Sequence, residues 1–251
     1  MAKVSEKLLV LGVPIHLVDN YLEWLVARLQ EKRGAHVVTL NSEMTIEADK
    51  NADLLKIISA ADLVVPDGSG IVFYCWLHGR PIDRCPGIEL AEALLTAAGD
   101  PEKAWPVFFF GSAPGVAETA AKTWQQRIRG LEIAGTHDGF LSPATEVELK
   151  HTLKELQPPI IMVGLGAPRQ EFWIAENRSL CPNSIWIGVG GSLDIWAGIK
   201  SRAPDWFCDH HLEWLYRLYK EPWRWRRMLA LPQFAGRAIA DRLLQGRSVV
   251  Q

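Results

Sequence analysis

The chain has 251 residues, of which 48% are hydrophobic and 22% are charged, and its net charge is −2. These values indicate one large globular α/β domain, or one domain with an appendage. The sequence also excludes a membrane-spanning protein, because no uninterrupted apolar run approaches the ~18 residues that cross a bilayer. The charge is uneven: residues 214–251 hold eight Lys or Arg against two Asp or Glu, so residues 1–213 carry −8. An acidic body with a basic tail indicates an anionic partner at the tail.

Short apolar runs alternate with longer amphipathic segments over the first 200 residues. Several of the runs are continuously apolar, as expected where helices cover both faces of a sheet. The alternation predicts a doubly wound, mostly parallel α/β sheet. The predicted strands are residues 8–13, 36–40, 62–66, 106–111, 131–135, 160–165 and 184–190. The predicted helices are residues 20–32, 45–60, 87–99, 114–129, 144–156 and 169–179.

The composition changes near residue 202, and no strand is predicted beyond it. We therefore predict a core of residues 1–200 and a helical appendage of residues 201–251. The predicted helices of the appendage are 205–220, 223–230 and 233–246, with breaks at Pro222 and Pro232.

One stretch of the appendage, EWLYRLYKEPWRWRRM at residues 213–228, contains three Trp, two Tyr, four Arg and one Lys. Tryptophan and tyrosine favour membrane interfaces, and basic side chains are drawn to anionic groups. The stretch is therefore predicted to face an anionic surface, an apolar surface, or both.

Polar or glycine-rich segments follow six of the predicted strands. Ligands of open α/β sheets collect beyond the carboxyl ends of the strands, so these segments predict one long cleft. Glycines allow backbone N–H groups to approach phosphate, and helix N-termini favour anions. The segments are residues 39–43, 67–70, 111–115, 136–140, 166–171 and 190–194.

Several common phosphate-binding and metal-binding motifs are missing from the sequence. GLGAPR (164–169) and GVGGSL (188–193) lack the third glycine of a dinucleotide fingerprint, and no Gly-Lys pair of a P-loop occurs. No Asp-x-Asp motif occurs either, and the seven histidines form no metal-ligand pattern. We therefore expect backbone amides and arginines to neutralise a bound diphosphate, without a metal or another cofactor. The four cysteines show no paired spacing and are expected to be free thiols.

Six segments in one order resemble the WecG/TagA/CpsF family of bacterial glycosyltransferases, over nearly the whole chain. The resemblance implies an inverting, metal-independent enzyme with a Rossmann-like core. It implies transfer of an N-acetylmannosamine-type sugar from a UDP-sugar to a polyprenyl-diphosphate-linked sugar, in synthesis of teichoic acid, exopolysaccharide or another cell-surface polysaccharide. It also implies a cytoplasmic location at the inner face of the cell membrane and is compatible with a homo-oligomer. The segments are TLNSEM, VPDGSGI, GAPRQEFW, GVGGSLDIWAG, RAPDWF and EWLYRLYKEPWRWRR.

The resemblance implies that Asp67 is the general base, because it places the catalytic carboxylate in this P-D-G-x-G motif. An inverting transfer is a single displacement, in which one carboxylate takes the proton from the attacking acceptor hydroxyl. The alternative is a turn aspartate that caps the helix after Gly68.

Thr39 and Asn41 end the neighbouring predicted strand, and their spacing directs both side chains to the same side. They are candidates for hydrogen bonds to the donor sugar or its phosphate; the alternative is capping of the helix that begins at Glu43. Gln170, at the start of another helix, is predicted to reach the β-phosphate or a sugar hydroxyl. Glu171 is expected to orient its neighbours or to cap that helix.

The resemblance also places the uracil-ribose pocket at Asp194 and at Gly139 and Phe140, although a lone aromatic such as Phe140 is commonly a core residue. Arg84 matches a family arginine on the acceptor side; the alternative is an exposed salt bridge. Arg202, in the segment RAPDWF, is explained equally well as a site residue or as a structural link (a pin) between core and tail. The glycines predicted to line the UDP-sugar site are Gly68, Gly111, Gly139, Gly166 and Gly190.

Arg217, Arg224 and Arg227 are the appendage residues that the resemblance brings to the diphosphates. Arginine suits this role because its planar, permanently charged fork binds phosphate oxygens bidentately. The alternative is a solvated basic face, to which we assign Arg226 and Lys220.

Two other classes of protein remain open from the sequence. One is a non-catalytic nucleotide-sugar-binding protein of a polysaccharide assembly complex. The other is a binder of single-stranded nucleic acid that uses the Arg/Trp tail. The acidic core argues against the second, so we expect no nucleic-acid partner.

Overall fold

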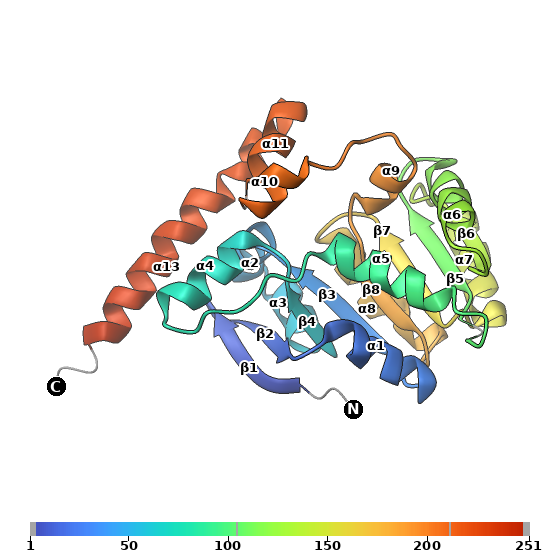
Figure 1. Cartoon of the computed structure of the whole chain (residues 1–251), viewed down its shortest axis with the longest axis horizontal. Coiled ribbons are helices and arrows are strands. Elements are labelled where there is room, and N and C mark those ends of the chain that lie inside the picture. The colour runs from blue at the N-terminus through green and yellow to red at the C-terminus, as the bar shows by residue number, and fades with distance from the viewer. Residues whose placement is uncertain (1–3, 104, 211, 248–251) are drawn as a thin grey trace.

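The computed structural model describes residues 4–103, 105–210 and 212–247, with side chains up to residue 244 (Figure 1). Its strands are β1 (Val4–Val10), β2 (Val13–Val18), β3 (Ala35–Leu40), β4 (Leu63–Pro66), β5 (Val107–Gly111), β6 (Ile133–His137), β7 (Ile160–Gly164) and β8 (Ile185–Gly188). Its core helices are α1 (Tyr21–Gln30), α2 (Ser42–Lys50), α3 (Ala52–Ser59), α4 (Ser69–Leu77), α5 (Gly87–Ala98), α6 (Val116–Arg127), α7 (Pro143–Leu156), α8 (Arg169–Asn177), the 3-10 helix η1 (Arg178–Leu180) and α9 (Ser192–Trp196). The tail has α10 (Asp205–Asp209), α11 (Glu213–Lys220), the 3-10 helix η2 (Pro222–Arg224), α12 (Trp225–Met228) and α13 (Ala230–Arg247).

Six strands form one sheet in the order β4-β3-β8-β7-β5-β6, and every neighbouring pair is parallel. The predicted α/β class with a doubly wound parallel sheet is therefore confirmed. Because all six strands run in the same direction, their carboxyl ends meet at one edge of the sheet. The polar segments singled out in the sequence follow these ends.

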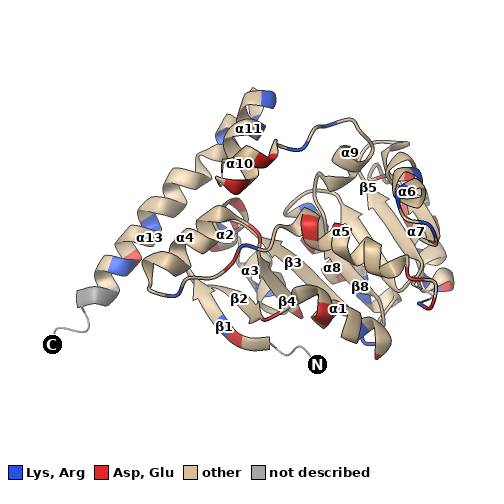
Figure 2. Cartoon of the chain, in the orientation of Figure 1, with Lys and Arg blue, Asp and Glu red and all other residues tan. Residues whose placement is uncertain are grey.

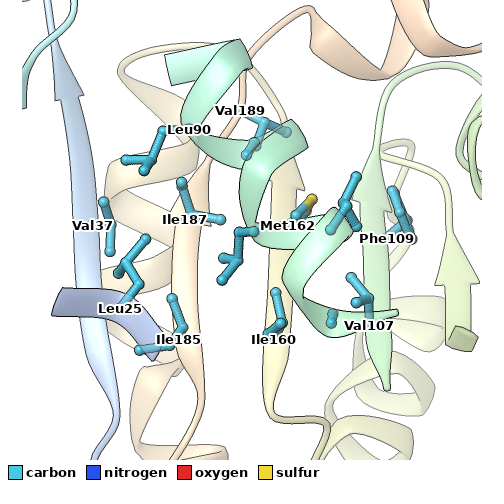
Figure 3. Close-up of a cluster of buried hydrophobic side chains, with 14 of the residues drawn as sticks. Leu25, Val37, Leu90, Val107, Phe109, Ile160, Met162, Ile185, Ile187 and Val189 are labelled. Carbon is cyan, nitrogen blue, oxygen red and sulfur yellow. The ribbon is translucent and has the colours of Figure 1, made fainter. Parts of the chain in front are cut away.

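Helices bury both faces of the sheet, as the continuously apolar strands predict. On one face, α1, α5, α6 and α9 cover side chains that include Val37, Phe109, Met162 and Ile187 (Figure 3). On the other face, α7 and α8 cover the alternate residues of the strands, such as Phe108 and Phe110. Successive strand residues point to opposite faces, so each central strand contributes to two packed layers.

The predicted strand at residues 8–13 is confirmed for residues 8–10, which end β1, but residues 11–12 form a turn and the resulting β-hairpin lies outside the main sheet. β1 and β2 pair antiparallel, and Leu11 and Gly12 between them have φ of 49° and 85°. Two positive φ values are typical of a type I′ hairpin turn, which the apolar run concealed. The hairpin packs beside the edge strand β4, where the backbone N–H of Val64 donates to Nδ1 of His16 at 3.0 Å. This contact covers an otherwise open sheet edge.

The helix predictions also require correction, including the one at residues 205–220, where the structure has two helices, α10 and α11. Residues 45–60 form two helices, because Asn51 ends α2 and its side chain caps α3 through the backbone N–H of Leu54 at 3.1 Å. Helix α4 was missed because its sequence, SGIVFYCWL, is apolar around its whole circumference. Pro232 is not a break: it lies in the first turn of α13, where its missing N–H costs no intrahelical hydrogen bond.

The last helix packs onto the core rather than standing apart from it. α13 runs along α2 and α4 (Figure 1), and Phe234 and Ala238 belong to the same buried cluster as Ile71 and Tyr74. In the described part of the chain, no helix combines the length and the apolar character needed to cross a membrane.

Candidate active site

Asp67 lies directly after β4, at the edge where the strands end. Its Oδ1 accepts a hydrogen bond from the backbone N–H of Gly87, the first residue of α5, at 2.8 Å. Gly68 caps α4 without any side-chain hydrogen bond, so Asp67 holds the start of α5 and does not cap its own helix. Burial raises the pKa of Asp67, and the hydrogen bond from Gly87 and the charges of Arg217 and Arg84 partly oppose that rise. A carboxyl with a raised pKa is suited to accept a proton.

Glycines press the loops after β3 and β4 together around Asp67. A Cβ on Gly68 would lie 2.9 Å from Cβ of Asn41, and one on Gly87 would lie 2.7 Å from Cγ2 of Thr39. Such distances are below normal carbon contact, so glycine is required at both positions. Packing therefore explains why residue 68, predicted to line the UDP-sugar site, is a glycine. These contacts bring Thr39, Asn41 and Asp67 into one cluster.

Thr39 and Asn41 both make structural hydrogen bonds. Thr39 is 8% exposed, and its Oγ1 donates to the carbonyl oxygen of Gly188 at 3.2 Å. Asn41 is the N-cap of α2: its Oδ1 accepts from the backbone N–H of Met44 at 3.0 Å. The capping alternative is therefore confirmed for Asn41. The cap uses the amide oxygen and not the Nδ2 donor.

Gln170 bridges the loops that follow β7 and β8. Its backbone N–H donates to the carbonyl oxygen of Gly166 at 3.1 Å, and its Oε1 accepts from the backbone N–H of Gly190 at 3.0 Å. Its Nε2 donates to Oε1 of Glu171 at 2.9 Å, so Glu171 fixes the orientation of the amide. Gly166 and Gly190 have φ of 76° and 52°, and a Cβ added at either position would meet no atom within 4 Å. Space is therefore open beside both backbone positions, and the approach of a ligand to them stays a prediction.

Glu171 is fully buried, and sequence reasoning underestimated it. Burial raises its pKa to about 7, partly opposed by the hydrogen bond from Gln170, and among the described residues its Oε2 finds no hydrogen-bond partner. Removing a carboxyl group from water disfavours its charged form. Within the Q-E pair of the motif, Gln170 contacts the loop after β8 and Glu171 holds Gln170 in place.

Arg84 is joined to the appendage through Glu213, a residue that sequence reasoning missed. The Nη2 of Arg84 donates to Oε2 of Glu213 at 2.9 Å, while the other carboxylate oxygen, Oε1, accepts from Arg217. The side chains of Arg84 and Glu213 are 11% and 14% exposed, so the alternative of an exposed salt bridge is wrong. Neighbouring positive charge outweighs burial and lowers the pKa of Glu213. The i, i+4 spacing of Glu213 and Arg217 was the available sequence signal.

The other two candidate arginines of the tail are also held by carboxylates. Arg224 pairs with Glu221, three residues earlier, and Arg227 donates through Nε to Oε2 of Glu43 at 3.0 Å. Glu43 lies in the first turn of α2, next to the Asn41 cap. The two arginines therefore belong to different short helices, Arg224 to η2 and Arg227 to α12, both after Pro222.

Asp194 lies in the first turn of α9 and is linked to the tail. Its Oδ1 accepts from the hydroxyl of Ser112, and its Oδ2 contacts Nζ of Lys200 at 2.8 Å. Lys200 also pairs with Glu221 at 3.1 Å, so Lys200 connects Asp194 of α9 to the appendage. Ser112 and Lys200 were missed because neither belongs to a recognisable motif.

Among the remaining predicted pocket residues, Gly139 is linked to Asp194 through Ser112. The backbone N–H of Gly139 donates to the carbonyl oxygen of Ser112 at 2.8 Å. Phe140 is 73% exposed, so the core alternative is wrong, and its backbone N–H donates to Oδ1 of Asp138 at 2.8 Å. A Cβ on Gly111 would lie 2.5 Å from the backbone of Gly164, so glycine at this position serves strand packing.

Arg202 pairs with Glu89 of α5, which confirms its interpretation as a pin between core and tail. Lysines and arginines recur along α11 and α13 (Figure 2). Arg226 lies over the ring of Trp225, 5.4 Å from its centroid, and Lys220 lies over Tyr216 at 5.7 Å.

Among the described residues no group of three or more His, Cys, Asp and Glu side chains could hold a metal ion, and all four cysteines are free thiols.

Known proteins match this chain over most of its length. The description "Glycosyl transferase WecG/TagA/CpsF family" fits residues 8–248. An N-acetylglucosaminyldiphosphoundecaprenol N-acetyl-beta-D-mannosaminyltransferase of Bacillus spizizenii is 38% identical over 226 residues, 88% of this chain and 86% of that protein. A protein of the same name from Bacillus subtilis is 34% identical over 220 residues, 87% of this chain and 84% of that protein. The chain therefore belongs to the WecG/TagA/CpsF family of glycosyl transferases.

Proposed function

We propose that this glycosyltransferase moves an N-acetylmannosamine-type sugar from a UDP-sugar to a polyprenyl-diphosphate-linked sugar. The names of the two Bacillus relatives support the transferred sugar and the acceptor class. The UDP donor, inversion at the anomeric carbon and independence from metal rest on the family resemblance and on the arginine-rich tail. The product then serves synthesis of a cell-surface polysaccharide, such as a teichoic acid or an exopolysaccharide.

The observation that carries this proposal is the position of Asp67. Its carboxyl group lies at the sheet edge, its pKa is raised by burial, and Arg84 and Arg217 are near enough to act on that pKa. One oxygen of Asp67 is committed to Gly87. We assign the other oxygen as the base.

The proposed reaction is one displacement. The acceptor hydroxyl forms a bond to the anomeric carbon while the bond from that carbon to the β-phosphate oxygen breaks. The electron pair of the broken bond leaves with UDP, and the hydroxyl proton passes to Asp67. Attack opposite the leaving group inverts the anomeric carbon. Thr39, Asn41 and Gln170 are the groups that we assign to hold the donor sugar and its phosphate.

We assign the positive charge of the tail to stabilise the departing diphosphate. Arg217 has a side chain that is 47% exposed, and it shares Glu213 with Arg84. A phosphate group can replace a carboxylate as partner of such an arginine, because both present oxygens to the same planar fork. Charge stabilisation by preorganised donors contributes on the order of 10²–10³ in rate.

The appendage is also proposed to rest on the inner face of the cell membrane. Tyr219, Trp223 and Trp225 are 78%, 71% and 54% exposed on the tail. Aromatic rings with a polar edge favour the membrane interface, and neighbouring basic residues add attraction to anionic lipid. An acceptor with a polyprenyl chain is anchored in the same membrane.

The substitution Asp67→Asn tests the assignment. Loss of the base is expected to lower kcat by about 10²–10⁴-fold, while the dissociation constant of the UDP-sugar changes by less than about threefold. In the wild-type enzyme, kcat/KM is expected to fall towards acid pH as Asp67 becomes protonated, and this acid limb should vanish in the variant. Transfer of radiolabelled sugar and calorimetric titration of UDP-sugar measure the two quantities. Unchanged turnover removes Asp67 as base, and binding without any transfer by the wild type favours a non-catalytic sugar-nucleotide-binding protein.

A further inference from the structure

An apolar groove of about 750 Å³ lies between α4 and the tail. Its walls include Phe73 and Trp76 of α4, Trp214 of α11, and Met228, Leu231 and Phe234 from the end of the chain. Its volume lies within the range of about 300–1,000 Å³ that is typical of small-molecule sites. None of these residues belongs to the proposed sugar-nucleotide site.

One end of the groove adjoins the proposed active site. Ser69 and Gly70 line it, and they follow Asp67 by two and three residues. Ser42 lines the same end and follows the Asn41 cap. The groove is therefore continuous with the loops that hold the proposed base.

The far walls of the groove reach the protein surface. Trp76 and Phe73 are 62% and 37% exposed on α4. Apart from Ser42 and Ser69, the residues that line the groove are apolar or glycine, and none is charged. A lining of this kind suits an uncharged hydrocarbon chain and gives no partner to a lipid headgroup or to nucleic acid.

We propose that this groove binds the isoprenoid segment next to the diphosphate of the acceptor lipid. This inference rests on the proposed function, because it extends the same active site along the lipid. A chain attached to a diphosphate at the cleft must pass from the active site towards the bilayer, and the groove provides an apolar path in that direction. Each methylene group that it buries strengthens binding roughly fourfold.

The tail then has a second role in substrate recognition. Trp214 lies next to Glu213, which holds Arg84 and Arg217, and Met228 lies next to Arg227. Neighbouring charged and apolar side chains of the appendage thus contact different parts of one amphipathic ligand. The arginines meet the diphosphate, and their neighbours meet the hydrocarbon.

The substitution Ala235→Trp tests this assignment by filling the groove from α13. Ala240→Trp, at an exposed position of the same helix, is the matched control, and Val72→Trp blocks the groove from α4. Transfer is measured in detergent with N-acetylglucosamine diphosphate esterified either to a long polyprenol or to butanol. We expect Ala235→Trp and Val72→Trp to raise KM for the polyprenyl acceptor at least tenfold and to leave kcat/KM for the butyl acceptor within twofold. Ala240→Trp should behave as the wild type with both acceptors.

Titration with undecaprenyl phosphate in the same detergent gives a readout that needs no transfer. Ala235→Trp should weaken its binding at least tenfold and leave UDP-sugar binding unchanged, even if the proposed reaction itself is wrong. Equal effects on both acceptors, or unchanged binding of undecaprenyl phosphate, overturn the inference. It is also overturned if Ala235→Trp abolishes sedimentation with phosphatidylglycerol vesicles free of acceptor, which assigns the groove to general membrane docking. A changed oligomeric mass assigns it to a subunit contact and overturns it as well.

Discussion

The core and the appendage are held in place by different forces. In the core, strand residues such as Phe109 and Ile187 are fully buried between layers of helices. In the tail, α10 and α11 have no buried residue, and their attachment depends on ion pairs such as Arg84 with Glu213 and Arg202 with Glu89. An exposed ion pair such as Arg202 with Glu89 contributes about 0–1 kcal/mol, whereas a fully buried aliphatic or aromatic side chain contributes about 1.5–3 kcal/mol.

This difference indicates which part of the molecule can change its contacts when a ligand binds. A sheet edge built on close packing keeps Asp67 and its neighbours at constant positions. Arginines held only by carboxylates can exchange those partners for phosphate oxygens with little loss of stability. α13 differs from the rest of the tail, because Phe234 anchors it in the core cluster.

The largest expected effect is on the free energy of unfolding, and it distinguishes α13 from the other tail helices. Phe234 is 1% exposed, so Phe234→Ala should lower the free energy of unfolding by about 3–5 kcal/mol through the lost contacts and the cavity. Ile239→Ala, at an exposed position of the same helix, should change it by less than about 0.5 kcal/mol. Urea denaturation measures both, and hydrogen exchange locates the loss in α13. Equal effects of the two substitutions would show that the helix does not depend on this anchor.

The next effect belongs to the core and depends on pH. The pKa of Glu171 is raised from 4.5 to about 7 in the folded protein, so the folded state binds this proton more tightly than the unfolded state. Its contribution to stability is complete below pH 4.5 and is lost as the pH rises to 7, by about 3 kcal/mol in all.

Glu171→Gln keeps the acceptor oxygen for Gln170 and removes the titration. The variant should therefore gain stability relative to the wild type as the pH rises from 4.5 to 8, most of it before pH 7 is passed. Denaturation midpoints across this pH range measure the difference. A constant difference between the two proteins would mean that Glu171 is ionised at no cost.

The smallest effect distinguishes two arginines of the tail. Arg217→Ala should lower kcat/KM on the lipid-linked acceptor by about 10²-fold, because charge near the leaving diphosphate is lost. Arg226→Ala, which removes a cation placed over Trp225, should lower it by less than about threefold. Steady-state transfer assays measure both, and Arg217→Lys should recover part of the activity. Equal losses would reduce the tail to a general basic surface.

Much of the fold was predictable because apolar periodicity reports burial. The strand at residues 160–165 is continuously apolar, the strand at 36–40 is mostly so, and the sheet buries both faces of each. The hairpin of β1 and β2 was not predictable in this way, since its turn lies within an apolar run. Helix α4 was missed for a related reason: its apolar residues follow no period, because the core, the tail and the groove surround it.

The candidate site was predictable only as a set of residue types. The sequence by itself determined that six strand ends carry polar or glycine-rich segments and that the tail carries arginines beside aromatics. Only the tertiary structure decided that Asn41 caps a helix, that Glu213 joins Arg84 to Arg217, and that α4 and the tail enclose an apolar groove. The physical reason is distance along the chain: pairs such as Arg84 and Glu213 are separated by 129 residues, and no local pattern encodes their meeting.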